Sequence, residues 1–159
     1  NLPAAVTVQA YLHRTQDDLA RLVKSGATVR LVKGAFAEPT SMAVTSRSDR
    51  DGAYRKAIAT MLSPEALEAG VYPVFGTHDH SMVDFATHVA RENGWNRDQW
   101  EIEMLLGVRP DYQRELVEQG VSLRLYLPFG RDWFPYSIRR VGENPKNAWF
   151  VLRSIVGRK

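Results

Sequence analysis

Five short segments rich in Val, Leu, Ile and aromatic residues alternate along the chain with segments of helical periodicity. These five are typical of β-strands, and several are nearly continuous in apolar residues, as expected of a parallel sheet buried on both faces. They cover residues 5–12, 28–32, 72–76, 100–106 and 121–127. The pattern therefore predicts a parallel sheet with helices between its strands.

The intervening helices carry start and stop signals. Residues 15–18 fit a capping box that begins at Thr15, and Gly26 is placed to end the helix that follows. We expect Ser81 to cap a later helix that ends at Gly94. The remaining predicted helices cover residues 49–62, 63–70, 110–119, 133–142 and 145–156. The polar segment 40–50 is predicted to be a mobile loop.

Repeated strand–helix order indicates βα units around a parallel sheet. No G-x-G-x-x-G motif follows any predicted strand, so a Rossmann dinucleotide fold has no support. A TIM-like (β/α)8 barrel needs eight strands and about 250 residues, whereas this chain has 159 residues. We therefore expect residues 1–159 to form the C-terminal portion of such a barrel domain, supplying about its last five βα units. An open five-stranded sheet of the flavodoxin type is the structural alternative.

Composition narrows the possible chemistry. The chain has no Cys, which excludes disulfides, thiolate nucleophiles and Cys-ligated zinc, so redox chemistry would need a bound cofactor. Apolar residues make up 44% and the net charge is +3 with scattered basic residues. We therefore expect no nucleic-acid partner, since such proteins concentrate their positive charge. No apolar run approaches the roughly 20 residues of a transmembrane helix.

Two cations stand at the end of the second predicted strand. Arg30 lies within it, and Lys33 and Gly34 follow directly after it. Ligands of parallel α/β folds bind beyond the C-terminal ends of the strands. Cations there suit a phosphate or an electron-rich ring, and a glycine lets the backbone approach a ligand closely. The alternative is a solvated rim in which both cations pair with acidic residues.

The segment His78-Asp79-His80 follows the third predicted strand. Alternate residues at a strand end can both reach one metal ion, as in metal-dependent barrel hydrolases. Such a site needs further ligands, and only His88 follows, within a predicted helix. We therefore expect no metal and interpret His78 as a ligand-contacting or structural residue. A metal-dependent hydrolase stays as a second hypothesis.

Two further charged pairs follow. Glu101 and Glu103 point to the same side of the fourth strand, and we favour a pairing of Glu103 with a barrel cation over acid–base catalysis. Arg139 and Arg140 follow the last strand among aromatic residues. A guanidinium in that setting can clamp a carboxylate, although adjacent arginines often point into solvent. Glu143 is placed to hold Arg140 by an i,i+3 pair.

Six segments agree in order and spacing with a known family. They are residues 8–12, 30–36 with 38–39, 76–78, 101–107, 125–130, and 139–140 with 144–145. The combination of Arg-Leu-Val-Lys-Gly-Ala at 30–35 with the double arginine at 139–140 is specific. On these motifs the chain resembles the FAD-dependent proline dehydrogenases of the monofunctional bacterial type, over nearly its whole length.

The resemblance implies a distorted (β/α)8 barrel that oxidises L-proline to 1-pyrroline-5-carboxylate. A hydride would pass from C5 of proline to N5 of FAD, and the electrons would pass to a quinone. FAD would be contacted by Gln9, Arg30, Lys33, Gly34, Ala35, Phe36, Thr77, His78 and Glu143. Proline would be contacted by Leu105, Tyr126, Tyr136, Arg139 and Arg140.

Among these, the resemblance assigns catalytic roles to four residues. Arg30 would lie near the flavin N5, Tyr126 would pack against the substrate ring, and Arg139 and Arg140 would bind the proline carboxylate. It also implies a cytoplasmic protein and leaves open a peripheral association with the inner face of the bacterial membrane.

The chain departs from the family pattern in three respects. Phe36 stands where the family usually has Tyr, and Glu103 stands where it usually has Gln. The early strands, which carry a Lys and an Asp of the family's active site, are absent. We therefore expect the isolated chain to be an incomplete enzyme that needs the N-terminal barrel strands. A non-catalytic relative, or a fragment held by a partner chain, is the third hypothesis.

Overall fold

Five parallel strands form one sheet in the computed structural model, which describes residues 4–127 and 129–130. The strands are β1 (Ala5–Gln9), β2 (Thr28–Val32), β3 (Tyr72–Gly76), β4 (Glu101–Leu105) and β5 (Leu123–Tyr126). The helices are α1 (Thr15–Lys24), α2 (Arg47–Met61), α3 (Pro64–Glu68), α4 (His80–Glu92) and α5 (Pro110–Glu118). All five predicted strands are present, but β1 ends at Gln9 rather than Leu12, and β5 covers only Leu123–Tyr126 of the predicted 121–127. The helices expected at 133–142 and 145–156 lie outside the described residues.

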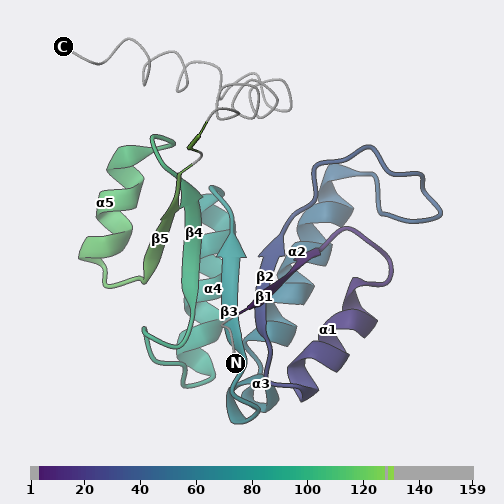
Figure 1. The fold of residues 1–159 in the computed structure, drawn as a ribbon, viewed down its shortest axis with the longest axis horizontal. Coiled ribbons are helices and arrows are strands. Elements are labelled where there is room, and N and C mark those ends of the chain that lie inside the picture. The colour runs from purple at the N-terminus through teal and green to yellow at the C-terminus, as the bar shows by residue number, and fades with distance from the viewer. Residues whose placement is uncertain (1–3, 128, 131–159) are drawn as a thin grey trace.

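The order of the strands decides between the two predicted folds. They lie in chain order, β1-β2-β3-β4-β5, and every neighbouring pair is parallel. Right-handed crossovers that always advance in one direction place every helix on the same side of the sheet. Figure 1 shows α1, α2, α4 and α5 around the outside of the curved sheet. This is the topology of consecutive (β/α)8 units, and the flavodoxin alternative is wrong because it requires the order 2-1-3-4-5.

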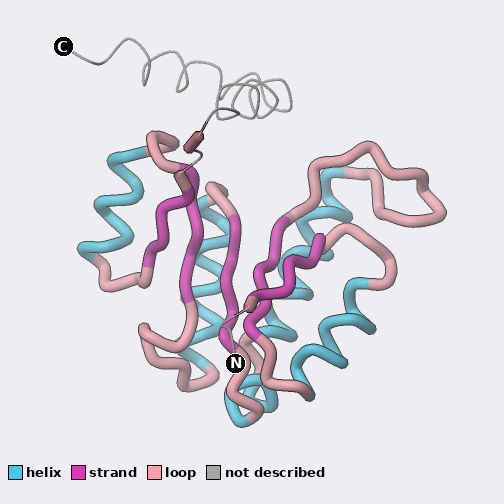
Figure 2. The backbone as a smooth tube through the Cα atoms, viewed as in Figure 1, coloured by secondary structure: helices cyan, strands magenta, loops and turns pink. Residues whose placement is uncertain are grey.

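The main core lies between this helix-covered face, called the outer face below, and the helices. Alternate strand residues such as Val29, Leu31, Phe75, Ile102 and Met104 are almost completely buried there. They pack in one cluster with helix residues that include Leu19, Tyr54, Ile58, Met82 and Leu116. The helices thus seal one face and leave the opposite, inner face of the sheet for other contacts (Figure 2).

Two predicted helix caps are wrong, because neighbouring groups compete for the same bonds. Thr15 does not form a capping box: its hydroxyl donates to the Gln9 carbonyl oxygen at 2.6 Å, and the N-cap residue Arg14 makes no side-chain cap. Asp79, rather than Ser81, caps α4, since its carboxylate accepts the Ser81 backbone N–H at 3.1 Å. The first contact fixes the start of α1 against the end of β1.

The polar segment 40–50 is only partly the open loop that its composition predicts. Helix α2 already begins at Arg47, and the Ser46 hydroxyl caps it by accepting the Asp49 N–H at 3.0 Å. The preceding residues pair with the connection after β1, where Val44 N donates to Tyr11 O at 2.9 Å. The segment is therefore tied to the sheet on the side where β1 and β2 end.

Truncation of Ile102 tests the outer-face core. Ile102→Ala in the full-length protein should lower the free energy of unfolding by about 2–5 kcal/mol, because the side chain is fully buried and would leave a cavity. Val117→Ala on the exposed side of α5 should stay within about 0.5 kcal/mol of the wild type. Urea unfolding measures both, and equal effects would contradict this description of the core.

Candidate active site at the C-terminal ends of the strands

The inner face of the sheet carries several charged side chains. Its charged members are Arg30 on β2, Glu101 and Glu103 on β4, and Arg124 on β5. Glu101 accepts hydrogen bonds from Arg124 at 2.6 and 2.9 Å and from the Tyr72 hydroxyl at 3.2 Å. Each carboxylate is therefore paired with an arginine, as predicted for Glu103.

Arg30 reaches across one strand to meet its partner. Its Nε donates to Oε2 of Glu103, although β3 lies between β2 and β4. The guanidinium passes over Gly76 on β3, where an added Cβ would lie 3.2 Å from Arg30 Nη2. The side chain of Glu103 is only 11% exposed, and that of Arg30 is 32% exposed. The glycine thus leaves the space in which a largely buried ion pair forms near the strand ends.

Lys33 lies just beyond β2 between two carboxylates. Its ammonium is 2.6 Å from Asp51 Oδ1 on α2 and 3.3 Å from Asp79 Oδ2 at the start of α4. Burial opposes ionisation of Asp79, but hydrogen bonds from Ser81 and Lys33 outweigh it and lower the pKa of that carboxyl. Lys33 therefore joins the ends of two helices at the mouth of the sheet.

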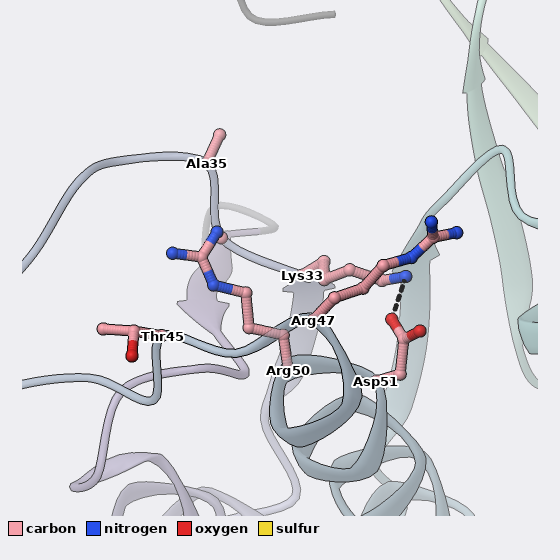
Figure 3. A pocket seen from close by; sticks show the side chains of 7 residues that line it. Lys33, Ala35, Thr45, Arg47, Arg50 and Asp51 are labelled. Atoms are coloured by element: carbon pink, nitrogen blue, oxygen red, sulfur yellow. Dashed lines mark hydrogen bonds and ion pairs between the residues drawn. The ribbon is translucent and has the colours of Figure 1, made fainter. Parts of the chain in front are cut away.

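Next to Lys33 lies a cavity of about 490 Å³ with an excess of positive charge. It is lined by Lys33, Gly34, Ala35, Thr45, Arg47, Arg50 and Asp51. In Figure 3, Arg50 points toward Ala35 and Thr45, whereas Arg47 extends past Lys33. The lining contains three cations and one carboxylate, and Lys33 also contacts Asp79, so the local charge is about +1 and the cavity suits an anionic group.

Gly34 shapes the same cavity through its backbone. Its φ of +100° is a conformation that side chains rarely adopt, and an added Cβ would lie 2.2 Å from the ring of Tyr11. Tyr11 is itself buried, and the Arg50 guanidinium lies 5.2 Å from the centre of its ring. Close packing of Gly34 on Tyr11 therefore holds the cavity wall in place.

The end of β3 brings Thr77 and His78 to the same edge. Thr77 is buried, and its backbone N–H donates to the Glu103 carbonyl oxygen at 3.2 Å. The Leu105 N–H lies 3.5 Å from His78 Nε2, whereas His78 Nδ1 is buried with no partner among the described residues. Burial lowers the pKa of His78, and the nearby Arg109 lowers it further.

The remaining predicted contacts lie at the strand ends or close to them. Leu105 and Tyr126 are register partners on β4 and β5, so the two predicted substrate contacts are neighbours. Gln9 ends β1 and is half-buried, while Ala35 and Phe36 are exposed after β2. Predicted contacts outside the described residues are Tyr136, Arg139, Arg140 and Glu143.

In the part of the chain that the structure describes, His80 does not belong to a set of side chains that could bind a metal ion. The His80 ring stacks on Tyr112 at a centroid distance of 3.6 Å. Among the described residues, no group of three His, Cys, Asp or Glu side chains is arranged to hold a metal ion. The hydrolase hypothesis therefore has no support from these residues.

Comparison with known proteins agrees with this geometry. The model of the proline dehydrogenase family matches residues 2–153, which is almost the whole chain. The chain belongs to the proline dehydrogenase family. The solved structures share its fold. Proline utilization A from Bdellovibrio bacteriovorus matches this chain with a TM-score of 0.76 at 24% sequence identity, and the match covers 86% of this chain and 16% of that protein.

Curated family members are similar over a limited part of their length. Proline dehydrogenase 2 of Bacillus subtilis (strain 168) is 38% identical over 95% of this chain and 48% of its own length. Proline dehydrogenase of Deinococcus radiodurans is 37% identical over 94% of this chain and 46% of its own length. The chain thus spans about half the length of these relatives.

The sequence-based prediction missed four residues that line the cavity, namely Thr45, Arg47, Arg50 and Asp51. Thr45, Arg47 and Arg50 lie in the segment predicted to be a polar loop, whereas Arg50 and Asp51 also lie in the predicted helix 49–62, whose first turn carries almost no apolar residues. A signal was present, since Arg47 and Arg50 are three residues apart and lie on neighbouring positions of a helix. Recognition of Ser46 as a cap would have revealed it.

The lowered pKa of His78 predicts an acid-sensitive contribution to stability. Neutral His78 contributes fully above its unfolded pKa of about 6.5, and the contribution is lost as the pH falls toward the lower folded pKa, because the unfolded chain then binds the proton more readily. Below pH about 6.5 the full-length protein should therefore lose stability relative to its His78→Gln variant. Urea unfolding at several pH values tests this, and a pH-independent difference would contradict it.

Proposed function

We propose that the protein containing this chain oxidises L-proline to 1-pyrroline-5-carboxylate with FAD as the hydride acceptor and passes the electrons to a quinone. The observation that carries the proposal is membership of the proline dehydrogenase family, over residues 2–153. The cationic groups of Arg30 and Lys33, gathered at one edge of the sheet, support it. In this reaction the cofactor performs the redox step, and the protein orients the proline ring and neutralises the proline carboxylate.

The described residues fit FAD by the chemistry of their donors. A cavity with three cations suits the diphosphate of the cofactor, and His78 Nδ1 is a buried polar atom without a described protein partner. FAD, when bound, supplies the acceptor for the hydride. We propose that Lys33, Gly34, Ala35, Phe36, Thr77 and His78 hold its ribityl, phosphate and adenosine parts, while Gln9 and Arg30 contact the flavin ring.

Arg30 would act by electrostatics. Its guanidinium carries a permanent positive charge in a partly buried position, where charge interactions are stronger than in water. Placed near N5, it would stabilise the negative charge that reduction brings to the ring. Glu143 would support the cofactor or the arginines of the substrate site.

Substrate binding would draw on the neighbouring strand ends. Leu105 and Tyr126, register partners on β4 and β5, would pack against the proline ring and exclude water. Arg139 and Arg140 would bind its carboxylate through forked hydrogen bonds, and Tyr136 would form a wall of the pocket. These roles follow the family resemblance of the residues.

Completion of the barrel would come from the N-terminal part of the protein. Residues on β1 and β5 are mostly exposed, and the outer edges of these strands pair with no strand among the described residues. Such edges are aggregation-prone unless they are covered, and closure into eight strands would cover both. We propose that residues 1–159 form the C-terminal portion of the (β/α)8 barrel domain.

Location follows from the electron acceptor. In the part of the chain that the structure describes, helices are too short or too polar to cross a membrane. A quinone resides in the lipid, so a quinone-reducing enzyme needs access to the membrane surface. We propose a cytoplasmic protein that can associate peripherally with the inner face of the membrane.

The visible absorption spectrum of the purified full-length protein tests the proposed reaction. Under anaerobic conditions, the flavin bands should bleach on addition of L-proline, because the hydride reduces the flavin and no oxygen is present to reoxidise it. D-proline serves as a control for the stereochemistry of the site. Flavin bands that stay unchanged with L-proline would contradict the proposed substrate, and a colourless protein would contradict the proposed cofactor.

The isolated chain tests the proposed incompleteness. Residues 1–159 alone should show no proline turnover above background, because part of the pocket and the closing strands are supplied elsewhere. Activity should be measured with a soluble electron acceptor beside equal amounts of the full-length protein. Robust turnover by the isolated chain would contradict the proposed dependence on the N-terminal strands.

A further inference from the structure

The ion pair between Arg30 and Glu103 is largely buried on the inner face of the sheet. The Glu103 carboxylate is nearly buried, and its bond comes from Nε of the guanidinium. The guanidinium lies over Gly76, where an added Cβ would come within 3.2 Å of its Nη2. Two features of separate strands therefore define one position for this cation, at the end of the inner face where Thr77 and His78 also lie.

We propose that Glu103 is a positioning residue that fixes the Arg30 guanidinium and, by offsetting its charge, lowers the reduction potential of the flavin. The inference rests on the proposed function, in which Arg30 lies near the flavin ring. It goes further by assigning a role to the carboxylate at position 103, and to Gly76 as the gap across which the pair forms.

The direction of the effect follows from the sign of the charges. A lone guanidinium would attract the negative charge of the reduced flavin and so favour reduction. A carboxylate in contact with that guanidinium brings the local net charge close to zero, which weakens the attraction. The same contact is charge-assisted and holds the guanidinium in one orientation. Glu103 therefore fixes the position of Arg30 and, at the same time, weakens the attraction of Arg30 for the negative charge of the reduced flavin.

Glu101 provides a matched control on the same strand. It is also a nearly buried carboxylate of the inner face, two residues before Glu103, and its partners are Arg124 and Tyr72. Because the hydrogen-bond partners of Glu101 among the described residues are Arg124 and Tyr72, and not Arg30, the same change of Glu to Gln there removes a charge without releasing Arg30.

The test is the midpoint potential of the bound flavin in the full-length protein, measured by anaerobic redox titration. For Glu103→Gln, the ratio of reduced to oxidised flavin at a fixed potential should rise about tenfold, the size expected for removal of one unit charge near the ring at an effective dielectric constant of about 20. For Glu101→Gln the ratio should rise by a smaller factor than for Glu103→Gln, because Glu101 lies farther from the C-terminal end of β4 and the Coulomb interaction falls with distance. An unchanged or lowered ratio in Glu103→Gln, or an equal rise in both variants, would overturn the proposal.

A second variant covers the case in which Glu103→Gln is purified without flavin. Glu103→Asp retains the negative charge, so it should bind flavin with a ratio close to that of the wild type. A colourless Glu103→Asp, or one with a tenfold higher ratio, would overturn the proposal. Wild-type flavin that bleaches with L-proline alongside an unshifted Glu103→Gln would refute this inference alone, whereas a wild type without flavin would refute the proposed function together with it.

Discussion

Burial of one face of the sheet under helices is the constraint from which the rest of the architecture follows. Because the strands are parallel and lie in chain order, every right-handed crossover must return on the same side. The apolar residues of the outer face, such as Leu31, Phe75 and Ile102, are sealed by this arrangement. The inner face is then free of helices, and the C-terminal strand ends are all brought to one edge.

Polar side chains can occupy the inner face only because they are paired there. A buried charge without a partner costs several kcal/mol, whereas a paired charge recovers much of that cost. Arg30 and Glu103 form one such pair, and Glu101 forms another with Arg124. Pairing across strands also couples their positions, since Arg30 on β2 is held by β4 and needs the gap at Gly76 on β3.

Strands and topology class were predictable because they depend on local composition, whereas the details of the site depend on contacts distant in sequence. Runs of apolar and β-branched residues place all five strands, and the pairing of Glu103 with a cation was expected from its face of β4. The predicted cap at Thr15 is wrong because the Thr15 hydroxyl instead donates a hydrogen bond to the carbonyl oxygen of Gln9, six residues earlier. The helix start at Arg47 was placed two residues too late, at residue 49, because a polar helix start carries no apolar periodicity.

Charge balance also limits how a barrel can be completed from these five βα units. Closure would remove water from the inner face and thereby raise the cost of any charge left unpaired. The existing pairs of Arg30 and Arg124 are already satisfied by carboxylates of β4, so strands that add cations to the inner face must bring their own acidic partners or an anionic ligand. The cavity beside Lys33 is the exception to this balance, because its three cations meet only the carboxylates of Asp51 and Asp79. An anionic ligand is the group that would restore it, and this is why the mouth of the sheet, rather than its interior, is suited to bind one.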